Sequence, residues 1–273
     1  MWTSQGTTMA TKDTSSGTQS IQRAALLLRL LTTHNRKGMR LVDIYRKAKL
    51  ERPTTHRILQ GLIAEGLVVQ DQESKLYFLG PALYEMGLAA APRPQFRDVC
   101  HPHIGELARI SGDTVFFTVR SGLDGVCLDR AEGAFPVKVF VLEIGKRRPL
   151  GVGGGGLAIL SALSNEEYDR ILHANAPRIT EKFPRYSEQK ARTAIARGQR
   201  MGYVLADTIE VPGIKSLAMA VRKPDGEVIG AISISAMAQR LDQDRLDELV
   251  PAMKAAVTAI QNELAAQPAV HFG

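Results

Sequence analysis

The stretch LVDIYRKAKLERPTTHRILQGLI, residues 41–63, decides the fold of the first part of the chain. Apolar residues recur at helical spacing from Leu41 to Ala48 and predict a short amphipathic helix. After a turn at residues 49–52, Pro53 suits the first position of a second helix because its missing N–H would have no partner there. That helix is expected to end near Gly66. Two helices joined by such a short turn predict a helix-turn-helix motif.

Basic side chains concentrate on this motif. Between residues 36 and 57 eight lysines and arginines stand against two acidic residues, while the whole chain carries a net charge of +7. The N-terminal end of a second helix enters the major groove in such motifs, where hydroxyls and guanidinium groups reach base edges and phosphates. The pattern favours double-stranded DNA as a partner, and the alternative is a small structural domain with a solvated basic face. The candidate DNA contacts are Arg40, Arg52, Thr54, Thr55, His56, Arg57 and Lys75.

The segments on either side of the motif complete a winged helix. Ser20 is a good N-cap for an apolar helical pattern over residues 20–33. Two short apolar runs, residues 67–69 and 76–79, flank a polar loop and predict a β-hairpin. A hairpin directly behind the second helix of the motif is the wing of a winged helix-turn-helix.

The remaining sequence predicts mixed helices and strands. The sequence predicts a linker helix from Leu83, and Pro92 and Pro94 mark a domain boundary. The expected helices are at 96–110, 156–163, 165–173, 187–201 and 241–265. The expected strands are at 114–119, 126–130, 137–144, 214–222 and 227–235.

Motifs in this order resemble the IclR family of bacterial transcriptional regulators. They lie at residues 19–24, 54–59, 77–80, 85–87, 145–150, 202–203 and 226–235. The chain departs from the usual family pattern at Pro53, where serine is common, in the glycine-rich stretch 151–156, and at residues 218–221, which lack the usual proline.

The resemblance implies an α+β protein with three ordered parts. These are a winged helix-turn-helix domain at 19–80, a linker helix at 81–94 and a GAF-like effector-binding domain at 95–268. Residues 1–18 are rich in Ser, Thr and Gly, and this composition predicts a disordered tail. It also implies a homodimer or homotetramer on a palindromic operator, with a small organic acid, aliphatic or aromatic, as the effector. No cofactor is implied.

A run of glycines suggests where the effector binds. Five of the six residues 151–156 are glycine, and an apolar helix follows directly. Such a helix start offers unpaired N–H groups to a carboxylate or phosphate, although the glycines could also serve close packing alone. Ser233 and Ser235 alternate with isoleucines, so both hydroxyls face one side of a strand. The candidate effector contacts are Gly153, Gly154, Gly155, Gly156, Leu157, Asp207, Ser216, Ser233 and Ser235.

Other classes of function find less support. The glycine run satisfies the dinucleotide pattern G-x-G-x-x-G, but no strand ending in an acidic residue follows it at the usual distance. Cys100, His101 and His103 suggest a metal cluster, although on a helix the two histidines point about 200° apart. Pro102 can break the helix and remove this objection, so a zinc site stays open as an alternative. We find no catalytic motif and expect no enzyme.

Two features bear on the location of the protein. No run of about 20 apolar residues predicts a membrane helix. Only two cysteines occur, which fits a reduced, cytoplasmic compartment. The main alternative function is a ligand-binding or interaction module without operator specificity.

Overall fold

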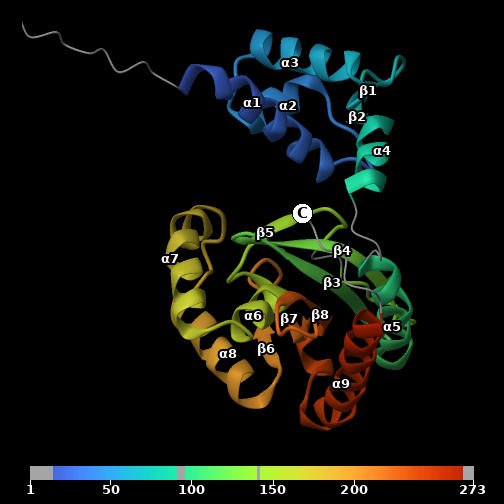
Figure 1. Ribbon diagram of the computed structural model, residues 1–273, viewed down its shortest axis with the longest axis vertical. Coiled ribbons are helices and arrows are strands. Elements are labelled where there is room, and N and C mark those ends of the chain that lie inside the picture. Colours follow the sequence, from blue (N-terminus) through green and yellow to red (C-terminus); the bar gives the residue numbers. More distant parts are fainter. Residues whose placement is uncertain (1–14, 91–95, 140–141, 267–273) are drawn as a thin grey trace, which may run out of the picture. The chain divides into compact units, whose positions relative to one another are not determined.

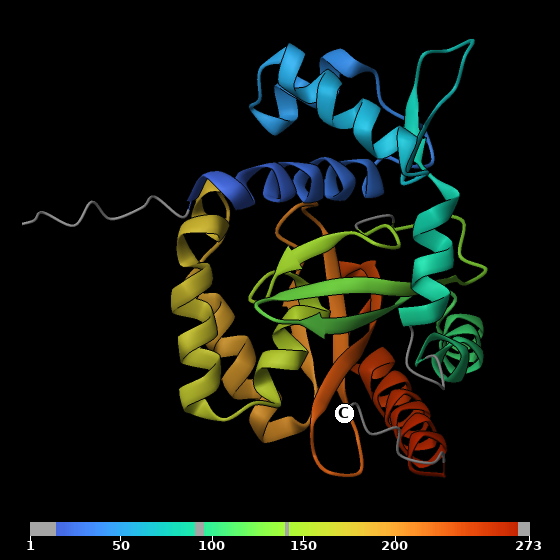
Figure 2. The same ribbon diagram turned by 45° about the horizontal axis from the view of Figure 1, so that its top comes forward.

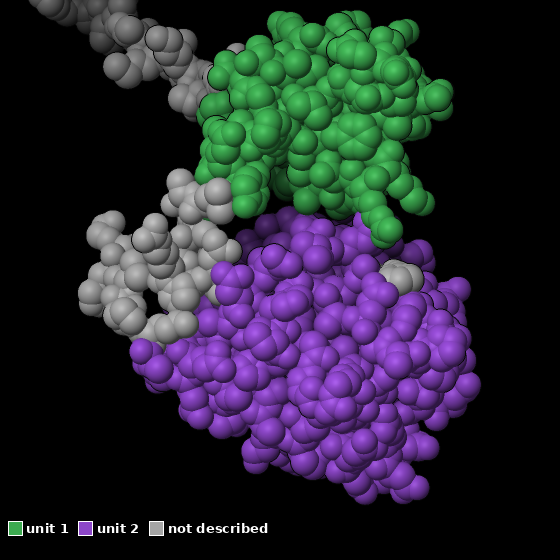
Figure 3. All heavy atoms as spheres, turned by 90° about the vertical axis from the view of Figure 1, so that its right-hand side faces the viewer, with its two compact units in different colours: residues 1–90 green, residues 91–273 purple. Residues whose placement is uncertain are grey.

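The computed structural model describes residues 15–90, 96–139 and 142–266 (Figure 1). The chain divides into two compact units, residues 1–90 and 91–273, coloured separately in Figure 3. Each unit has a hydrophobic core of its own. The predicted boundary at Pro92 and Pro94, and residues 1–14 of the predicted tail, lie outside the described residues. The rest of that prediction is wrong, because residues 15–18 form the first turn of a helix, Ser15–Thr32.

The N-terminal unit is a winged helix-turn-helix, as predicted. Its elements are α1 (Ser15–Thr32), α2 (Leu41–Ala48), α3 (Arg52–Ala64), β1 (Val68–Gln70), β2 (Tyr77–Leu79) and α4 (Pro81–Ala90). Strands β1 and β2 pair antiparallel, with Val69 opposite Phe78. Apolar side chains from the first three helices and from Tyr77 form one core, which fixes the hairpin against the helices.

The C-terminal unit is built on a six-stranded antiparallel sheet of order β5-β4-β3-β8-β7-β6. The strands are β3 (Thr114–Ser121), β4 (Asp124–Glu132), β5 (Arg147–Pro149), β6 (Val204–Asp207), β7 (Ile214–Arg222) and β8 (Val228–Met237). The helical segments are α5 (Phe96–Ser111), α6 (Gly153–Ser161), α7 (Asn165–Lys182), α8 (Glu188–Met201), η1 (Ala238–Arg240) and α9 (Gln243–Ala266).

Alternation along the strands gives this sheet two different faces. Ile232 and Ile234 on β8 belong to a core shared with α5 and α9. Ala231, on the opposite face, packs in a second core with α6, α7 and α8. Figures 1 and 2 show the two groups of helices on opposite sides of the sheet. The arrangement confirms the predicted α+β class.

One predicted strand is wrong. Residues 137–139 and 142–144 form no strand, although Val139 and Leu142 are buried as the pattern suggested; residues 140 and 141 lie outside the described part. The backbone of Cys127 on β4 is already paired with Gly145 and Lys146, so these groups of β4 are not free to pair with residues 142–144. The strand that pairs with β4 at this edge is β5. Strand β6 was not predicted.

Candidate functional site

A basic hollow lies on the surface of the N-terminal unit, between the start of α2, the start of α3 and the wing. Four of the predicted DNA contacts line it: Arg40, Arg52, His56 and Lys75. Arg40 precedes α2 in an extended conformation and Arg52 opens α3, so both stand at the start of a helix beside the hollow.

The wing turn is held by its own side chains. Asp71 Oδ1 accepts hydrogen bonds from the backbone N–H of Ser74 at 2.7 Å and from its hydroxyl at 2.5 Å. These bonds hold the pKa of Asp71 below its usual value. Lys75 then takes a left-handed backbone conformation with φ of +56°. The hydrogen bonds of Asp71 therefore fix the turn, and with it the position of the Lys75 backbone.

The remaining predicted DNA contacts differ in exposure. Arg57 is exposed and Thr54 half-buried. Thr55, by contrast, is 0% exposed, and its hydroxyl donates to the carbonyl of Glu51 at 3.1 Å. The side chain of Thr55 therefore belongs to the core of the domain, and we correct the expectation that it lies on the exposed face.

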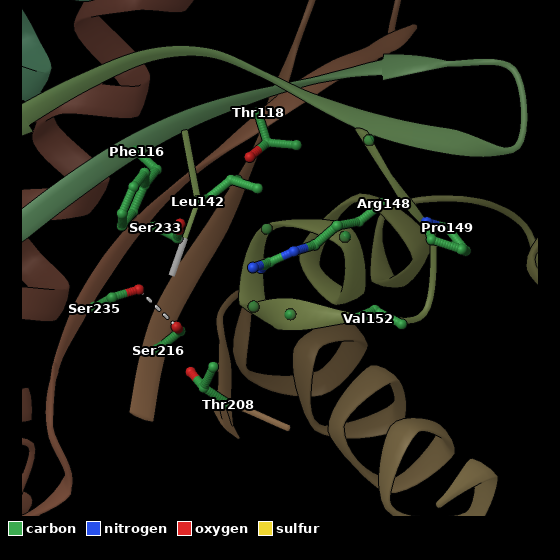
Figure 4. A pocket seen from close by; sticks show the side chains of 15 residues that line it. Phe116, Thr118, Leu142, Arg148, Pro149, Val152, Thr208, Ser216, Ser233 and Ser235 are labelled. Atoms are coloured by element: carbon green, nitrogen blue, oxygen red, sulfur yellow. Dashed lines mark hydrogen bonds between the residues drawn. The ribbon is translucent and has the colours of Figure 1, made fainter. Parts of the chain in front are cut away.

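A second hollow lies in the C-terminal unit, between the start of α6 and the face of β3, β7 and β8 that bears small polar side chains (Figure 4). The hollow is narrow, with a cavity volume of about 30 Å³. Its lining comprises Phe116, Thr118, Gly125, Leu142, Arg148, Pro149, Val152, Gly153, Gly154, Gly155, Gly156, Thr208, Ser216, Ser233 and Ser235.

The first turn of α6 forms one wall. The first N–H groups of a helix have no intrahelical acceptor and carry a partial positive charge. Here Val152, the N-cap residue, supplies no side-chain acceptor for them either. A Cβ on Gly154 would lie 2.6 Å from Cβ of Ser216, and one on Gly155 would lie 3.0 Å from Oγ1 of Thr118. These two glycines let the helix start approach the sheet closely, and they leave its backbone bare towards the hollow.

Hydroxyl groups form the opposite wall. Ser216 and Ser235 face each other across β7 and β8, and their hydroxyls are hydrogen-bonded at 2.8 Å. Ser233 lies on the same face of β8, as the alternation with the isoleucines predicts. Thr208 is 5% exposed, and its hydroxyl has no hydrogen-bond partner among the described residues. The wall thus offers small polar groups suited to an oxygen-bearing ligand.

A buried cation completes the hollow. Arg148 is 8% exposed and extends into the hollow beside the start of α6, where a Cβ on Gly153 would lie 3.4 Å from its Nη1 (Figure 4). Glu210, in the loop between β6 and β7, forms an ion pair with it. Burial lowers the pKa of Arg148, and the carboxylate of Glu210 opposes that shift. The guanidinium stays charged at neutral pH, and in the structure the carboxylate of Glu210 compensates that charge.

The sequence matches known families over both units. Residues 89–262 match "Bacterial transcriptional regulator IclR C-terminal", and residues 20–72 match "IclR helix-turn-helix domain". The chain belongs to the IclR family of bacterial transcriptional regulators. With both domains of the family in place, it is a DNA-binding transcriptional regulator.

Individual members of the IclR family are similar along most of their length. The HTH-type transcriptional regulator XynR of Escherichia coli K12 is 25% identical over 246 residues, covering 90% of this chain and 97% of XynR. The HTH-type transcriptional repressor AllR of Salmonella typhi is 28% identical, covering 84% of each protein. The crystal structure of an IclR homologue from Microbacterium hydrocarbonoxydans, complexed with 4-hydroxybenzoate, aligns with a TM-score of 0.71 at 21% identity, covering 90% of this chain and 98% of that one. Its fold is the same.

The structure brings together most of the effector contacts predicted for this IclR protein and separates two of them. Gly153 to Gly156 and the three serines line one hollow. Leu157 is buried in the core between α6 and the helices behind it. Asp207 is exposed and lines a neighbouring groove beside α8. Leu157 and Asp207 are therefore not part of the hollow.

Three polar residues of the hollow were absent from the prediction. They are Thr118, Arg148 and Thr208. The run of Lys146, Arg147 and Arg148 was visible as a source of positive charge, but strand β5 is too short for its alternation to show which side chain turns inward. No sequence signal identified Thr208.

The suspected metal cluster on α5 is split between different partners. His101 Nδ1 lies 2.7 Å from Oδ2 of the buried Asp129, whereas His103 Nε2 lies 2.8 Å from Oε1 of Glu263. Within the described residues, no three His, Cys, Asp or Glu side chains gather in a way that could hold a metal ion. Likewise, no described helix combines the length and apolar character that a membrane crossing requires.

The two cysteines are expected to be inert in the native protein. Cys100 and Cys127 are buried, and burial raises the pKa of each thiol to about 12. Because the thiolate is the reactive form, neither should react with Ellman's reagent at pH 8, while both should react in guanidinium chloride. Titration of free thiols with and without denaturant checks this. Fast labelling of one native thiol would show that its surroundings open readily.

Proposed function

We propose that a small organic acid binds in the hollow at the start of α6 and thereby changes the affinity of this regulator for DNA. The observation that carries the proposal is the buried Arg148 beside the uncapped helix start, facing the hydroxyls of Ser216, Ser233 and Ser235. A carboxylate suits the guanidinium and the backbone N–H groups, and the hydroxyls suit its other polar atoms. The 4-hydroxybenzoate bound to the homologue is a compound of this class.

We propose that the N-terminal unit reads its operator with α3 and the wing. Arg52, His56 and Arg57 are exposed at the beginning of α3, with Thr54 beside them. Arg40 and Lys75 flank them and contact the phosphate backbone. In motifs of this type the start of the second helix reaches base edges in the major groove, while neighbouring cations fix its register on the phosphates.

We propose that the protein acts in the cytoplasm as a homodimer or homotetramer on a palindromic operator. Two-fold symmetry in the protein matches inverted half-sites in the DNA. The acid changes DNA affinity by binding more tightly to one arrangement of the two DNA-binding domains than to the other, because only differential affinity can shift such an equilibrium.

The proposed effector site is tested by calorimetry on the full chain. Acetate, lactate, benzoate and 4-hydroxybenzoate would be titrated into wild type and into Ser233→Ala and Ser235→Ala. We expect wild type to bind at least one acid, and each serine variant to bind it roughly 5- to 20-fold more weakly, as expected for the loss of one buried hydrogen bond. The exposed Ser74 on the wing supplies a control, Ser74→Ala, that should leave acid binding unchanged. Unchanged affinity in both pocket variants would contradict the proposed site.

A further inference from the structure

The ion pair between Arg148 and Glu210 lies where a carboxylate effector would need to bind. Arg148 is buried beside the start of α6, and the side chain of Glu210 is 24% exposed. A buried guanidinium next to the positive end of a helix requires a compensating anion. In the structure Glu210 supplies that anion. A ligand carboxylate on the same guanidinium would fulfil the same electrostatic requirement.

We propose that Glu210 is an internal substitute for the carboxylate of the effector, which displaces it from Arg148 and so releases the loop between β6 and β7. This inference rests on the proposed function of the hollow. The exchange replaces one carboxylate by another and leaves the charge at Arg148 compensated. A neutral molecule of the same shape offers no such replacement, so the exchange also selects acids over their amides.

Thr208 gives independent support for a ligand at this place. Its side chain lines the hollow and is 5% exposed, and its hydroxyl has no partner among the described residues. A buried hydroxyl without a hydrogen bond is costly. An oxygen-bearing ligand in the hollow would supply the missing partner. Thr208 is also only two residues from Glu210, so one loop carries both groups.

The loop is built so that Glu210 can move without disturbing the sheet. The backbone N–H of Thr208 donates to Ile214 at 2.8 Å and closes the base of the loop. On the other side of this base, Ala238 N–H donates to Gly213 at 2.7 Å, and Gly213 has a φ of +80°. Between these anchors Val211 is 41% exposed. These two hydrogen bonds fix the register of β6 and β7. The part of the loop between them makes few packing contacts.

The test compares carboxylate binding with and without the internal competitor. Acetate, benzoate and 4-hydroxybenzoate, with acetamide and benzamide as neutral counterparts, would be titrated calorimetrically into the full-length protein. Wild type would be compared with Glu210→Gln, Arg148→Gln and the double variant. Arg147→Gln is the matched control, since Arg147 is the neighbouring residue on β5 but pairs with Asp124 outside the hollow.

The expected result is a gain of affinity on removing Glu210. If the ion pair is closed about nine-tenths of the time, Glu210→Gln should bind carboxylates roughly tenfold more tightly than wild type. Amide binding should not change. In the Arg148→Gln background the second substitution should give no gain, and Arg147→Gln should behave as wild type.

Two different failures are distinguishable. If wild type binds an acid and Glu210→Gln binds it no more tightly, the displacement is overturned while the proposed effector site stands. If no variant, including Glu210→Gln, binds any of the acids, the proposed function fails and the displacement with it. Should Arg148→Gln not fold, as its melting curve would show, the comparison of Glu210→Gln with wild type decides alone.

Discussion

Replacing Arg52 and Arg57 together with alanine is expected to weaken binding to the operator by roughly 100-fold or more, because each contact of this kind contributes about 1–3 kcal/mol. Both side chains are exposed at the start of α3, and Arg52 lines the basic hollow between the helices and the wing. Neither belongs to the core of the domain, so the variant should fold normally. Fluorescence anisotropy with labelled operator DNA at fixed salt measures the effect.

Thr55→Val is the matched control for this loss. The side chain of Thr55 is buried and its hydroxyl bonds only to the carbonyl of Glu51, so valine keeps its shape while losing one local hydrogen bond. We expect operator affinity within about twofold of wild type and a small loss of stability, on the order of 1 kcal/mol. If Thr55→Val weakened operator binding as much as the double arginine variant, α3 would be presented to DNA in another orientation.

Gly154→Ala should destabilise the effector domain by about 1–3 kcal/mol, as overpacking of a close contact does. The added Cβ would lie 2.6 Å from Cβ of Ser216, so either α6 or β7 must move. That movement would also disturb the hollow, and binding of the acid should weaken together with stability. The midpoint of urea unfolding and calorimetric titration measure the two effects.

Gly156→Ala, in the same helix, is the control for this prediction. It distinguishes the effect of the close contact at Gly154 from the general effect of replacing glycine with alanine. The nearest atom to a Cβ on Gly156 is the backbone nitrogen of Gly151 at 3.6 Å, an ordinary contact. Alanine favours the helix over glycine by up to about 1 kcal/mol, so this variant should be as stable as wild type or more so. Equal destabilisation by both substitutions would mean that the close approach to Ser216 is not what requires Gly154.

Local patterns predicted the DNA-binding domain well because its elements follow from neighbouring residues. Helical spacing, a proline at a helix start and a polar loop between two apolar runs each act over a few positions. The error at Thr55 was avoidable on the same grounds. Thr55, Leu59 and Leu62 recur at the spacing of one helix face, and all three are buried. The basic composition of the segment favours an exposed Thr55, whereas the helical spacing places its side chain in the core.

The effector hollow was less predictable because it is assembled from distant parts of the chain. Ser233 could be assigned from alternation within one strand. Arg148 and Thr208 reach the hollow only through the order of strands in the sheet, which places β5 and the end of β6 around the start of α6. Asp207 shows the same limit. Thr208, the next residue, lines both the hollow and the neighbouring groove, whereas Asp207 lines the groove and not the hollow.

The decisive measurement is a footprint of the full-length protein on the DNA upstream of its own gene, at moderate salt, with and without the acid that calorimetry identifies. We predict protection of an inverted repeat, and a shift of the half-saturating protein concentration when the acid is added. Nonspecific charge contacts weaken steeply as salt rises, so protection that persists marks a specific operator. Binding without a preferred sequence, or a footprint that no bound acid alters, would contradict a regulator that senses an acid in this hollow.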